Sequence, residues 1–317
     1  MEYRIHSNNG IKTSVIGLNF TNFKFFEENY KKQIIGSILE IANKHKLNFI
    51  SIPSFNDELL RTILEWKKVN NWEPIISIQI GFSAIDYKTM NKLYDKKIIF
   101  QNRFENIVEE ASKLLDTYQI DKIQFLSLFY PKLDHIKQND FDAIQKELKK
   151  TGIVQSVGIH CQFVSDAILL ANRINIDFIE LEIDINTSSD IINSLFKICQ
   201  RNNIAIICLQ KETLEVDNNK NDEDLNVLLS LLYSGEQQFL SNFETNQSKA
   251  QDNLFHLALR KNLIGNFQTI GIAIFTIEDF DKLKSSLTHA YLSGDEVLQL
   301  QNYSLPPIYE SPKNRHS

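Results

Sequence analysis

The chain has 317 residues, with 34 Lys and Arg against 40 Asp and Glu, so its formal net charge at pH 7 is −6. This acidic balance excludes a general nucleic-acid-binding protein, which needs a positive surface to meet phosphates. With 43% hydrophobic and 23% charged residues, the composition is typical of a globular protein with a sizeable core. The polar start lacks the apolar segment of a signal peptide, and no stretch approaches the roughly 18 uninterrupted apolar residues of a spanning helix. We therefore expect a cytoplasmic protein that does not bind membranes.

The sequence contains none of the short motifs that indicate a metal or a phosphate-binding loop. Cys161, Cys199 and Cys208 are too few and too scattered for a disulfide framework or a paired-cysteine metal site. The chain has 10 Gly and 6 Pro, and neither GxGxxG nor GxxxxGK[ST] occurs. We expect no metal, and a bound nucleotide would have to be held by other means.

An N-terminal hairpin is the first predicted element, because Asn9-Gly10 supplies the positive φ angles of a tight turn. Beyond it, short apolar runs alternate with segments whose apolar residues recur at helical spacing. The predicted pairs of strand and helix are 15–18 with 31–44, 49–52 with 58–68, 75–80 with 105–116, 122–126 with 141–150, 156–159 with 165–173, 178–183 with 189–202, 204–209 with a helix after a break, and 269–272 with 276–289. Apolar strands joined by helices favour a parallel sheet covered on both faces, and eight such pairs favour a closed barrel. The predicted fold class is therefore α/β, a (β/α)8 TIM barrel in a single domain spanning 1–317.

Three segments depart from this repeat. Residues 81–103 and 211–244 are long insertions, and the tail over 301–317 is irregular. Loops that follow strands gather at the ligand end of such barrels, so both insertions are expected to shape the mouth. The aromatic run over 20–26 is open to two interpretations, a pocket or partner surface and a small core under the loop.

Several segments resemble an aldo-keto reductase in order and spacing along nearly the whole chain. They are the hairpin with Ile11–Leu18, and Leu47–Ile50, Tyr118–Gln124, Leu148–Ile159, Ile176–Glu182 and Cys199–Ile204. The resemblance implies that the hairpin plugs the bottom of the barrel. It also implies carbonyl reduction with NADPH by four residues: a Tyr that donates the proton, a Lys that lowers the pKa of this Tyr, an Asp that holds the Lys, and a His that orients the substrate.

None of these four residues is retained at the matching positions of this sequence. The Asp falls on Ser51, the Tyr on Phe55 or Asn56, the Lys on Gln79 and the His on Leu126. Hydride addition builds an alkoxide that must be protonated, and neither a benzyl side chain nor a leucine can donate a proton. Loss of one general acid typically costs about 10²–10⁴-fold in rate. We expect no reductase activity by the family mechanism.

The positions that the resemblance assigns to NADPH have changed as well. The Ser-Asn pair that holds the nicotinamide amide is His160-Cys161, the Gln on the sixth strand is Glu180, and the stacking Tyr is Ile183. The loop that clasps the pyrophosphate begins at Gln210, and the adenosine phosphate segment surrounds Phe275, without the cationic fork that a 2′-phosphate needs. Glu182, in contrast, matches an acid of the family. We expect no cofactor.

The remaining polar residues of the predicted mouth have two interpretations. His160 and Cys161, with Glu180, Glu182 and Asp184 on one face of a strand, could hold a metal or form a nucleophile and base pair. Adjacent strand residues point to opposite faces, however, and inward carboxylates are often satisfied by neighbouring strands. The structural interpretation is favoured.

Two classes of function follow. In the first, the protein is a non-reductase binding, regulatory or assembly subunit with a protein partner or a small ligand at the barrel mouth. The family resemblance includes non-catalytic members such as the modifier subunit of glutamate-cysteine ligase. In the second, it is a divergent NADP-dependent oxidoreductase or a non-redox enzyme that uses the remodelled mouth.

Overall fold

The computed structural model describes residues 2–6, 9–20, 28–53, 57–80, 97–129, 138–183, 187–210 and 265–272, together with residues 259, 262, 263, 281 and 283. Two of the three predicted departures from the repeat, 211–244 and 301–317, lie outside these residues, as do Phe55, Asp184 and Phe275. Most of the third, 81–103, also lies outside them. Its last residues, 97–103, belong to a helix rather than to a long connection.

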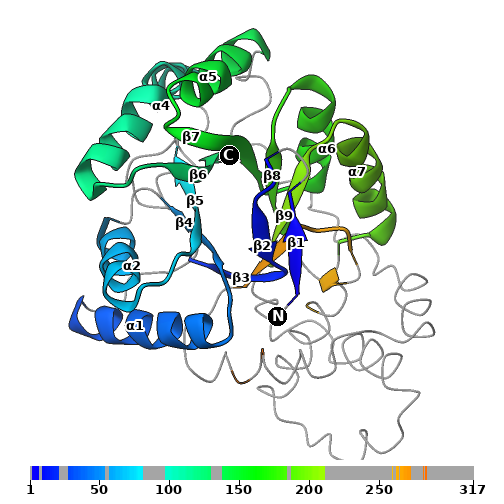
Figure 1. Ribbon diagram of the computed structural model, residues 1–317. Helices are drawn as coiled ribbons and strands as arrows, with labels where there is room; N and C mark the ends of the chain where they lie inside the picture. The colour runs from blue at the N-terminus through cyan, green and yellow to red at the C-terminus, as the bar shows by residue number, and fades with distance from the viewer. Residues whose placement is uncertain are drawn as a thin grey trace, which may run out of the picture.

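Eight parallel strands close into a barrel, as predicted (Figure 1). In order around the barrel they are β10 (Thr269–Ile272), β3 (Ile16–Asn19), β4 (Phe49–Pro53), β5 (Ile75–Ile80), β6 (Ile123–Phe129), β7 (Val154–Cys161), β8 (Phe178–Ile183) and β9 (Ala205–Gln210). Each strand pairs in parallel with its neighbours. The carboxyl ends of all eight strands therefore meet at one end of the barrel.

Helices connect the strands and lie around the outside of the barrel (Figure 1). They are α1 (Glu28–Lys44), α2 (Asp57–Asn70), α4 (Lys97–Tyr118), α5 (Gln138–Lys150), α6 (Val164–Arg173) and α7 (Ser189–Arg201). The predicted helix over 105–116 begins earlier, at Lys97. Within the described ranges, no helix combines the length and the apolar character needed to cross a lipid bilayer.

The N-terminal hairpin closes the end of the barrel at which the strands begin. It consists of β1 (Tyr3–Ile5) and β2 (Lys12–Ser14), which pair antiparallel. His6 follows β1, hydrogen-bonds Thr13 at 2.9 Å and lies with its ring 4.9 Å from that of Phe125. Thr269, the first residue of β10, donates to Thr13 at 2.7 Å. These contacts bury His6, and this burial lowers its pKa to about 4.

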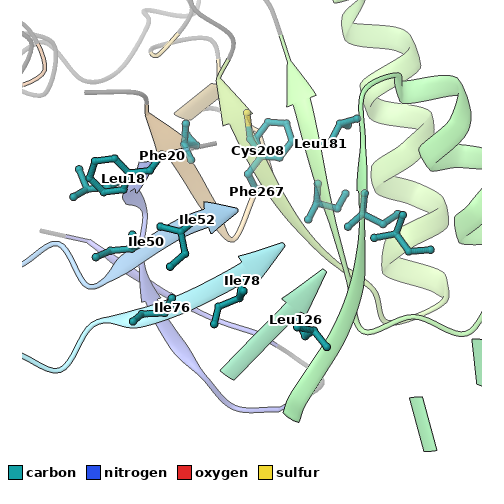
Figure 2. Packing of buried hydrophobic residues seen from close by; sticks show 14 of the residues in the cluster. Leu18, Phe20, Ile50, Ile52, Ile76, Ile78, Leu126, Leu181, Cys208 and Phe267 are labelled. Carbon is teal, nitrogen blue, oxygen red and sulfur yellow. The ribbon is translucent and has the colours of Figure 1, made fainter. Parts of the chain in front are cut away.

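Side-chain alternation divides the apolar residues into two layers. Outward positions of the strands pack under the helices in one large cluster, which includes Leu18, Ile50, Ile78, Leu126 and Cys208 (Figure 2). Inward positions form a smaller cluster inside the barrel, made of Phe49, Phe125, Phe178, Ala205, Ile207 and Leu209. The three phenylalanine rings pack edge to face. This inner apolar layer supports the polar side chains farther along the strands.

Candidate active site

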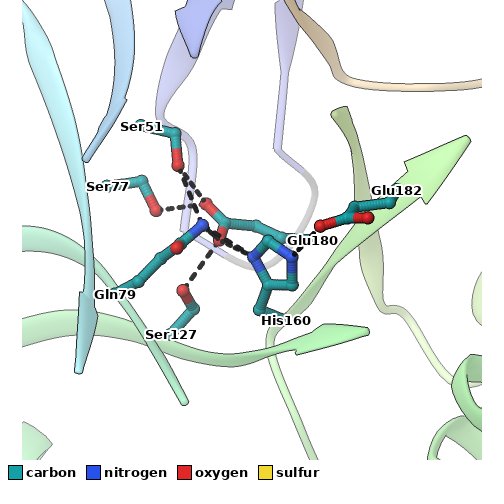
Figure 3. A network of polar contacts seen from close by, with 7 residues as sticks. All are labelled: Ser51, Ser77, Gln79, Ser127, His160, Glu180 and Glu182. Atoms are coloured by element: carbon teal, nitrogen blue, oxygen red, sulfur yellow. Dashed lines mark hydrogen bonds and ion pairs between the residues drawn. The ribbon is translucent and has the colours of Figure 1, made fainter. Parts of the chain in front are cut away.

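A network of polar side chains lies inside the barrel (Figure 3). Along the strands, it lies beyond the phenylalanine layer, on the side of the carboxyl ends. It comes from five consecutive strands, and we call it the acidic network. Its members are Ser51 of β4, Ser77 and Gln79 of β5, Ser127 of β6, His160 of β7, and Glu180 and Glu182 of β8. All are buried except Glu182, whose side chain is 9% exposed. Glu182 is therefore the charged member that solvent or a ligand can reach.

Three serines share a local pattern that explains their position. Each lies between two aliphatic residues of its strand, in Ile50-Ser51-Ile52, Ile76-Ser77-Ile78 and Leu126-Ser127-Leu128. Because successive side chains of a strand point to opposite faces, burying the aliphatic residues under the helices turns each serine inward. The apolar pattern of the strands thus directs hydroxyl groups into the barrel.

The carboxylate of Glu180 is the centre of the acidic network. Its Oε1 accepts from Ser77 at 2.5 Å and from Ser51 at 3.1 Å. Its Oε2 accepts from Ser127 at 2.8 Å and from the Gln79 amide at 2.9 Å. Burial alone would raise the pKa of Glu180, but His160 and the serine hydroxyls outweigh it and hold this pKa below its ordinary value. Glu180 is therefore a buried anion.

His160 lies between two carboxylates. Its Nε2 is 3.3 Å from Oε1 of Glu182, and its Nδ1 is 3.5 Å from Oε2 of Glu180. Burial opposes protonation of the ring, but hydrogen bonds and charge from both carboxylates raise the pKa of His160 above its ordinary value. The pair of contacts joins a fully buried acid to a partly exposed one through an imidazole, an arrangement that can hold and pass a proton.

Gln79 contributes one amide group with two different environments. Its Nε2 contacts Nδ1 of His160 at 2.6 Å as well as Glu180. Its Oε1 is buried and has no hydrogen-bond partner among the described residues. When the His160 ring is neutral, its Nδ1 accepts a hydrogen bond from the Gln79 amide and its Nε2 donates one to Glu182. The Gln79 oxygen is thus an acceptor to which the described part of the barrel brings no donor.

Apart from His160, the titratable groups that the described strands place beside Glu180 are acidic. The eight barrel strands, all within the described residues, contain no Lys or Arg, and their acidic residues are Glu180 and Glu182. No group of three or more His, Cys, Asp or Glu in the described part of the chain is arranged to hold a metal ion.

The barrel and its N-terminal hairpin agree with the family that the sequence resembles. A family profile described as "Aldo/keto reductase family" matches residues 56–260, more than half of the chain. The chain belongs to the aldo/keto reductase family. A search of the curated proteins found no match.

Solved structures of aldo-keto reductases share the fold over nearly their full length. The holo form of AKR11C1 from Bacillus halodurans has a TM-score of 0.68 at 16% identity, with 98% of this chain and 99% of that chain covered. The glycerol dehydrogenase AKR11B4 from Gluconobacter oxydans has a TM-score of 0.65 at 11% identity, covering 96% and 97%. An aldo/keto reductase from Klebsiella pneumoniae in complex with NADP and acetate has a TM-score of 0.60 at 14% identity, covering 97% of both chains. Identities this low show a shared fold alone.

Two of the four positions matched to aldo-keto reductase catalytic residues meet in the acidic network. Nε2 of Gln79 lies 3.3 Å from Oγ of Ser51, and both groups donate hydrogen bonds to Glu180. Leu126 does not join them, because its side chain packs in the outer cluster under the helices. The inward residue beside it is Ser127. A residue that touches a substrate in the mouth must face inward, so Leu126 in its present orientation does not contact a substrate there.

The positions matched to cofactor contacts are also divided by side-chain direction. Glu180 and His160 face the barrel interior, whereas Cys161 and Ile183 pack in the outer cluster. Cys161 follows His160 in the strand and packs in the outer cluster, where burial raises the pKa of its thiol and so favours the neutral form. Gln210, at the end of β9, is buried, and within the described ranges neither its Nε2 nor its Oε1 has a hydrogen-bond partner.

Sequence reasoning missed Ser77 and Ser127. Each donates to Glu180, but neither belongs to a recognised motif. The signal that could have found them is the recurrence of a serine between two aliphatic residues in neighbouring strands, combined with an acid at an inward position of β8.

Proposed function

We propose that this aldo/keto reductase family member does not reduce carbonyls and instead serves as a binding subunit, with a regulatory or assembly role, through its barrel mouth. The observation that carries the proposal is the acidic network, in which a buried Glu180 anion takes up the donors around it. Reduction of a carbonyl needs positive or proton-donating groups at this place.

The electrostatic argument concerns the alkoxide that forms when hydride reaches a carbonyl carbon. Enzymes stabilise such a charge with donors aimed at the oxygen. Here the hydroxyls of Ser51, Ser77 and Ser127 donate to Glu180. An alkoxide beside this network would lie near the Glu180 carboxylate, which already accepts from the three serine hydroxyls. The interior therefore opposes the transition state of carbonyl reduction.

The residues present do not fit NADPH in the way that the family resemblance implies. Glu180 replaces a Gln that contacts the nicotinamide amide, and its two oxygens already accept four hydrogen bonds from the protein. Cys161, matched to the other amide contact, packs under the helices. Neither Glu180 nor Cys161 therefore offers the free polar group that the nicotinamide amide requires, and this supports the proposal.

A fluorescence titration with NADPH tests the proposal directly. We expect no saturable change up to millimolar NADPH and no NADPH oxidation with a panel of aldehydes and ketones. Tight NADPH binding, or turnover of any member of the panel, would refute the proposal. Co-purification of one protein at fixed stoichiometry, checked by light scattering of the complex, would support the subunit role.

A second candidate is a non-redox enzyme that transfers protons at the mouth. The observation that favours it is His160, held between Glu180 and Glu182 by contacts at both ring nitrogens. Such a unit can take a proton from a substrate through the partly exposed Glu182. Hydrogen exchange from solvent D₂O into candidate carbonyl compounds, lost in Glu182→Gln, would favour this function over the subunit role.

A further inference from the structure

The side chain of Asn9 fastens the turn of the N-terminal hairpin to the barrel. Its Nδ2 donates to the hydroxyl of Ser156, a fully buried residue of β7. Its Oδ1 accepts from the backbone N–H of Ile11 at 2.8 Å. Both ends of the Asn9 amide are therefore occupied, one by the barrel and one by the hairpin itself.

The residue that follows, Gly10, is held as well. Its backbone N–H donates to the carbonyl oxygen of His6 at 2.9 Å. Asn9-Gly10 is also the only Asn-Gly pair in the sequence. In an unrestrained chain an asparagine reacts readily with the backbone nitrogen of a following glycine, because glycine has no Cβ to hinder the attack. The fold thus holds a reactive pair by hydrogen bonds at both of its residues.

The reaction open to this pair is deamidation through a cyclic imide. The Gly10 nitrogen forms a bond to Cγ of Asn9 and gives up its proton. The bond between Cγ and Nδ2 breaks, and the Nδ2 group takes up a proton and leaves as ammonia. Water then opens the five-membered ring at one of its two carbonyl carbons, so that the asparagine becomes aspartate or isoaspartate. No electrons are exchanged, and water is the co-reactant.

We propose that Asn9 is a deamidation site controlled by the fold, protected while the hairpin is docked on the barrel and reactive when the hairpin turn opens. Reaction requires the Gly10 nitrogen to lose the proton that it donates to His6, and it requires the Nδ2 group to leave Ser156. The bond from Ile11 fixes the orientation of the amide between them. Opening of the turn frees all of these groups. This inference does not depend on the proposed binding function.

Neither product of the reaction restores the docked turn. An aspartate side chain has no N–H to donate to Ser156, and it places a charge beside a buried hydroxyl. An isoaspartate lengthens the backbone by one atom. The turn then no longer matches the register of β1 with β2, in which Arg4 lies opposite Thr13. Deamidation therefore makes the opening of the hairpin irreversible.

Peptide mass spectrometry of the unmodified full chain measures the protection. The conversion of Asn9 to aspartate and isoaspartate is followed at neutral pH in the folded chain and in the chain unfolded by guanidinium chloride. Deamidation should be at least about tenfold slower in the folded chain, because the hydrogen bonds from Asn9 to Ser156, from Gly10 to His6 and from Ile11 to Asn9 must open first. Equal rates in the two states would overturn the proposal.

A variant of the barrel partner tests whether docking is responsible. Ser156→Ala removes the acceptor of the Asn9 Nδ2 group and leaves the Asn9-Gly10 pair intact, so the folded variant should deamidate several-fold faster than the unmodified protein. Ser112→Ala is the matched control, because the Ser112 hydroxyl donates to the carbonyl oxygen of Val108 within α4. The control should deamidate at the rate of the unmodified protein. Equal rates in Ser156→Ala and in this control would refute the role of Ser156.

Hydrogen exchange on the unmodified protein gives a second measurement that does not depend on a folded variant. The amide protons of Gly10 and Ile11 exchange with solvent when the same turn opens. Their protection factors should therefore match the ratio of the deamidation rates in the unfolded and folded chains. Deamidation of the folded chain much faster than this exchange allows would mean that Asn9 reacts within the docked turn, and this would overturn the proposed control by the fold.

Discussion

The hydroxyl of Ser77 donates to Oε1 of Glu180 at 2.5 Å, and this bond joins β5 to β8, two strands that are not neighbours in the barrel. Ser51 and Ser127 donate to the same carboxylate from β4 and β6. Glu180 therefore ties several strands together through the interior. It replaces water as the partner of their hydroxyls, so its removal would leave several buried donors unsatisfied.

We expect Glu180→Leu to lower the free energy of unfolding by about 3–5 kcal/mol, the usual cost of removing one partner from a buried charged network. Glu180→Gln should cost less, because an amide oxygen still accepts from the serines. Urea unfolding followed by circular dichroism measures both. Glu109→Gln, which removes an exposed charge, should stay within about 0.5 kcal/mol of the unmodified protein. A Glu180→Leu variant as stable as this control would show that the network does not hold the barrel together.

His6 should make the protein less stable in mild acid. Its pKa in the folded state is about 4, below the ordinary value of 6.5, because the ring is buried under the barrel. Between pH 6.5 and 4, the His6 ring is therefore protonated in the unfolded chain but neutral in the folded chain. Stability contributed by neutral His6 is present above pH 6.5 and falls by up to about 3 kcal/mol as the pH is lowered to 4.

The test for His6 compares the unmodified protein with His6→Gln by urea unfolding at several pH values from 7 to 4. The variant lacks the titrating group, so its free energy of unfolding should fall less over this range. Parallel pH profiles for the two proteins would contradict the prediction.

His160 should titrate in the opposite direction. Glu180 and Glu182 raise its pKa in the folded state, so its contribution to stability is fully present below the unfolded pKa of 6.5 and is lost as the pH rises through the folded value. The NMR titration of the His160 ring should give a pKa above the ordinary range. Glu182→Gln removes one carboxylate and should lower that pKa. An unchanged value in the variant would mean that the 3.3 Å contact carries no charge coupling.

The sequence predicted the strands well because each is a short run of Ile, Leu, Val or Phe that the barrel buries. It predicted the hairpin from Asn9-Gly10. Gly10 has the expected positive φ of 70°, whereas Asn9 does not have a positive φ. It predicted the acidic network only in part. A serine inside an apolar strand carries no chemical signal until neighbouring strands place several of them around one acid, so Ser77 and Ser127 were not recognised.

The position of Leu126 shows a further limit of sequence reasoning. A shift of one residue along a strand exchanges inward and outward faces. Leu126 and Ser127 differ by such a shift, and the structure places the leucine under the helices and the serine against Glu180. Loose motifs align strands without determining which residues face the mouth. Side-chain direction in β6 required the register with β5 and β7.

We expect the double variant Phe55→Tyr with Gln79→Lys to remain without carbonyl reductase activity. A Lys at position 79 would lie beside the Glu180 carboxylate, which is 2.9 Å from the present Gln79 amide. The new ammonium would pair with Glu180 instead of lowering the pKa of a tyrosine. NADPH oxidation with a panel of aldehydes measures the outcome, and appreciable turnover by the double variant would count against the proposed loss of reductase function.

Gly158 of β7 is required for the packing of the inner apolar layer. A Cβ at this position would lie 2.5 Å from the carbonyl oxygen of Phe178 and 2.7 Å from its ring. An added methyl group would force both the Phe178 backbone and its buried ring to shift, which costs free energy. Gly158→Ala should therefore lower the free energy of unfolding by about 1–3 kcal/mol. Gly36 of α1 is the matched control, because a Cβ there would have no described atom within 4 Å and alanine favours a helix. Gly36→Ala should raise stability by about 0.5–1 kcal/mol. If the two variants shifted the midpoint of urea unfolding in the same direction, close approach of β7 to Phe178 would not be the reason for glycine at position 158.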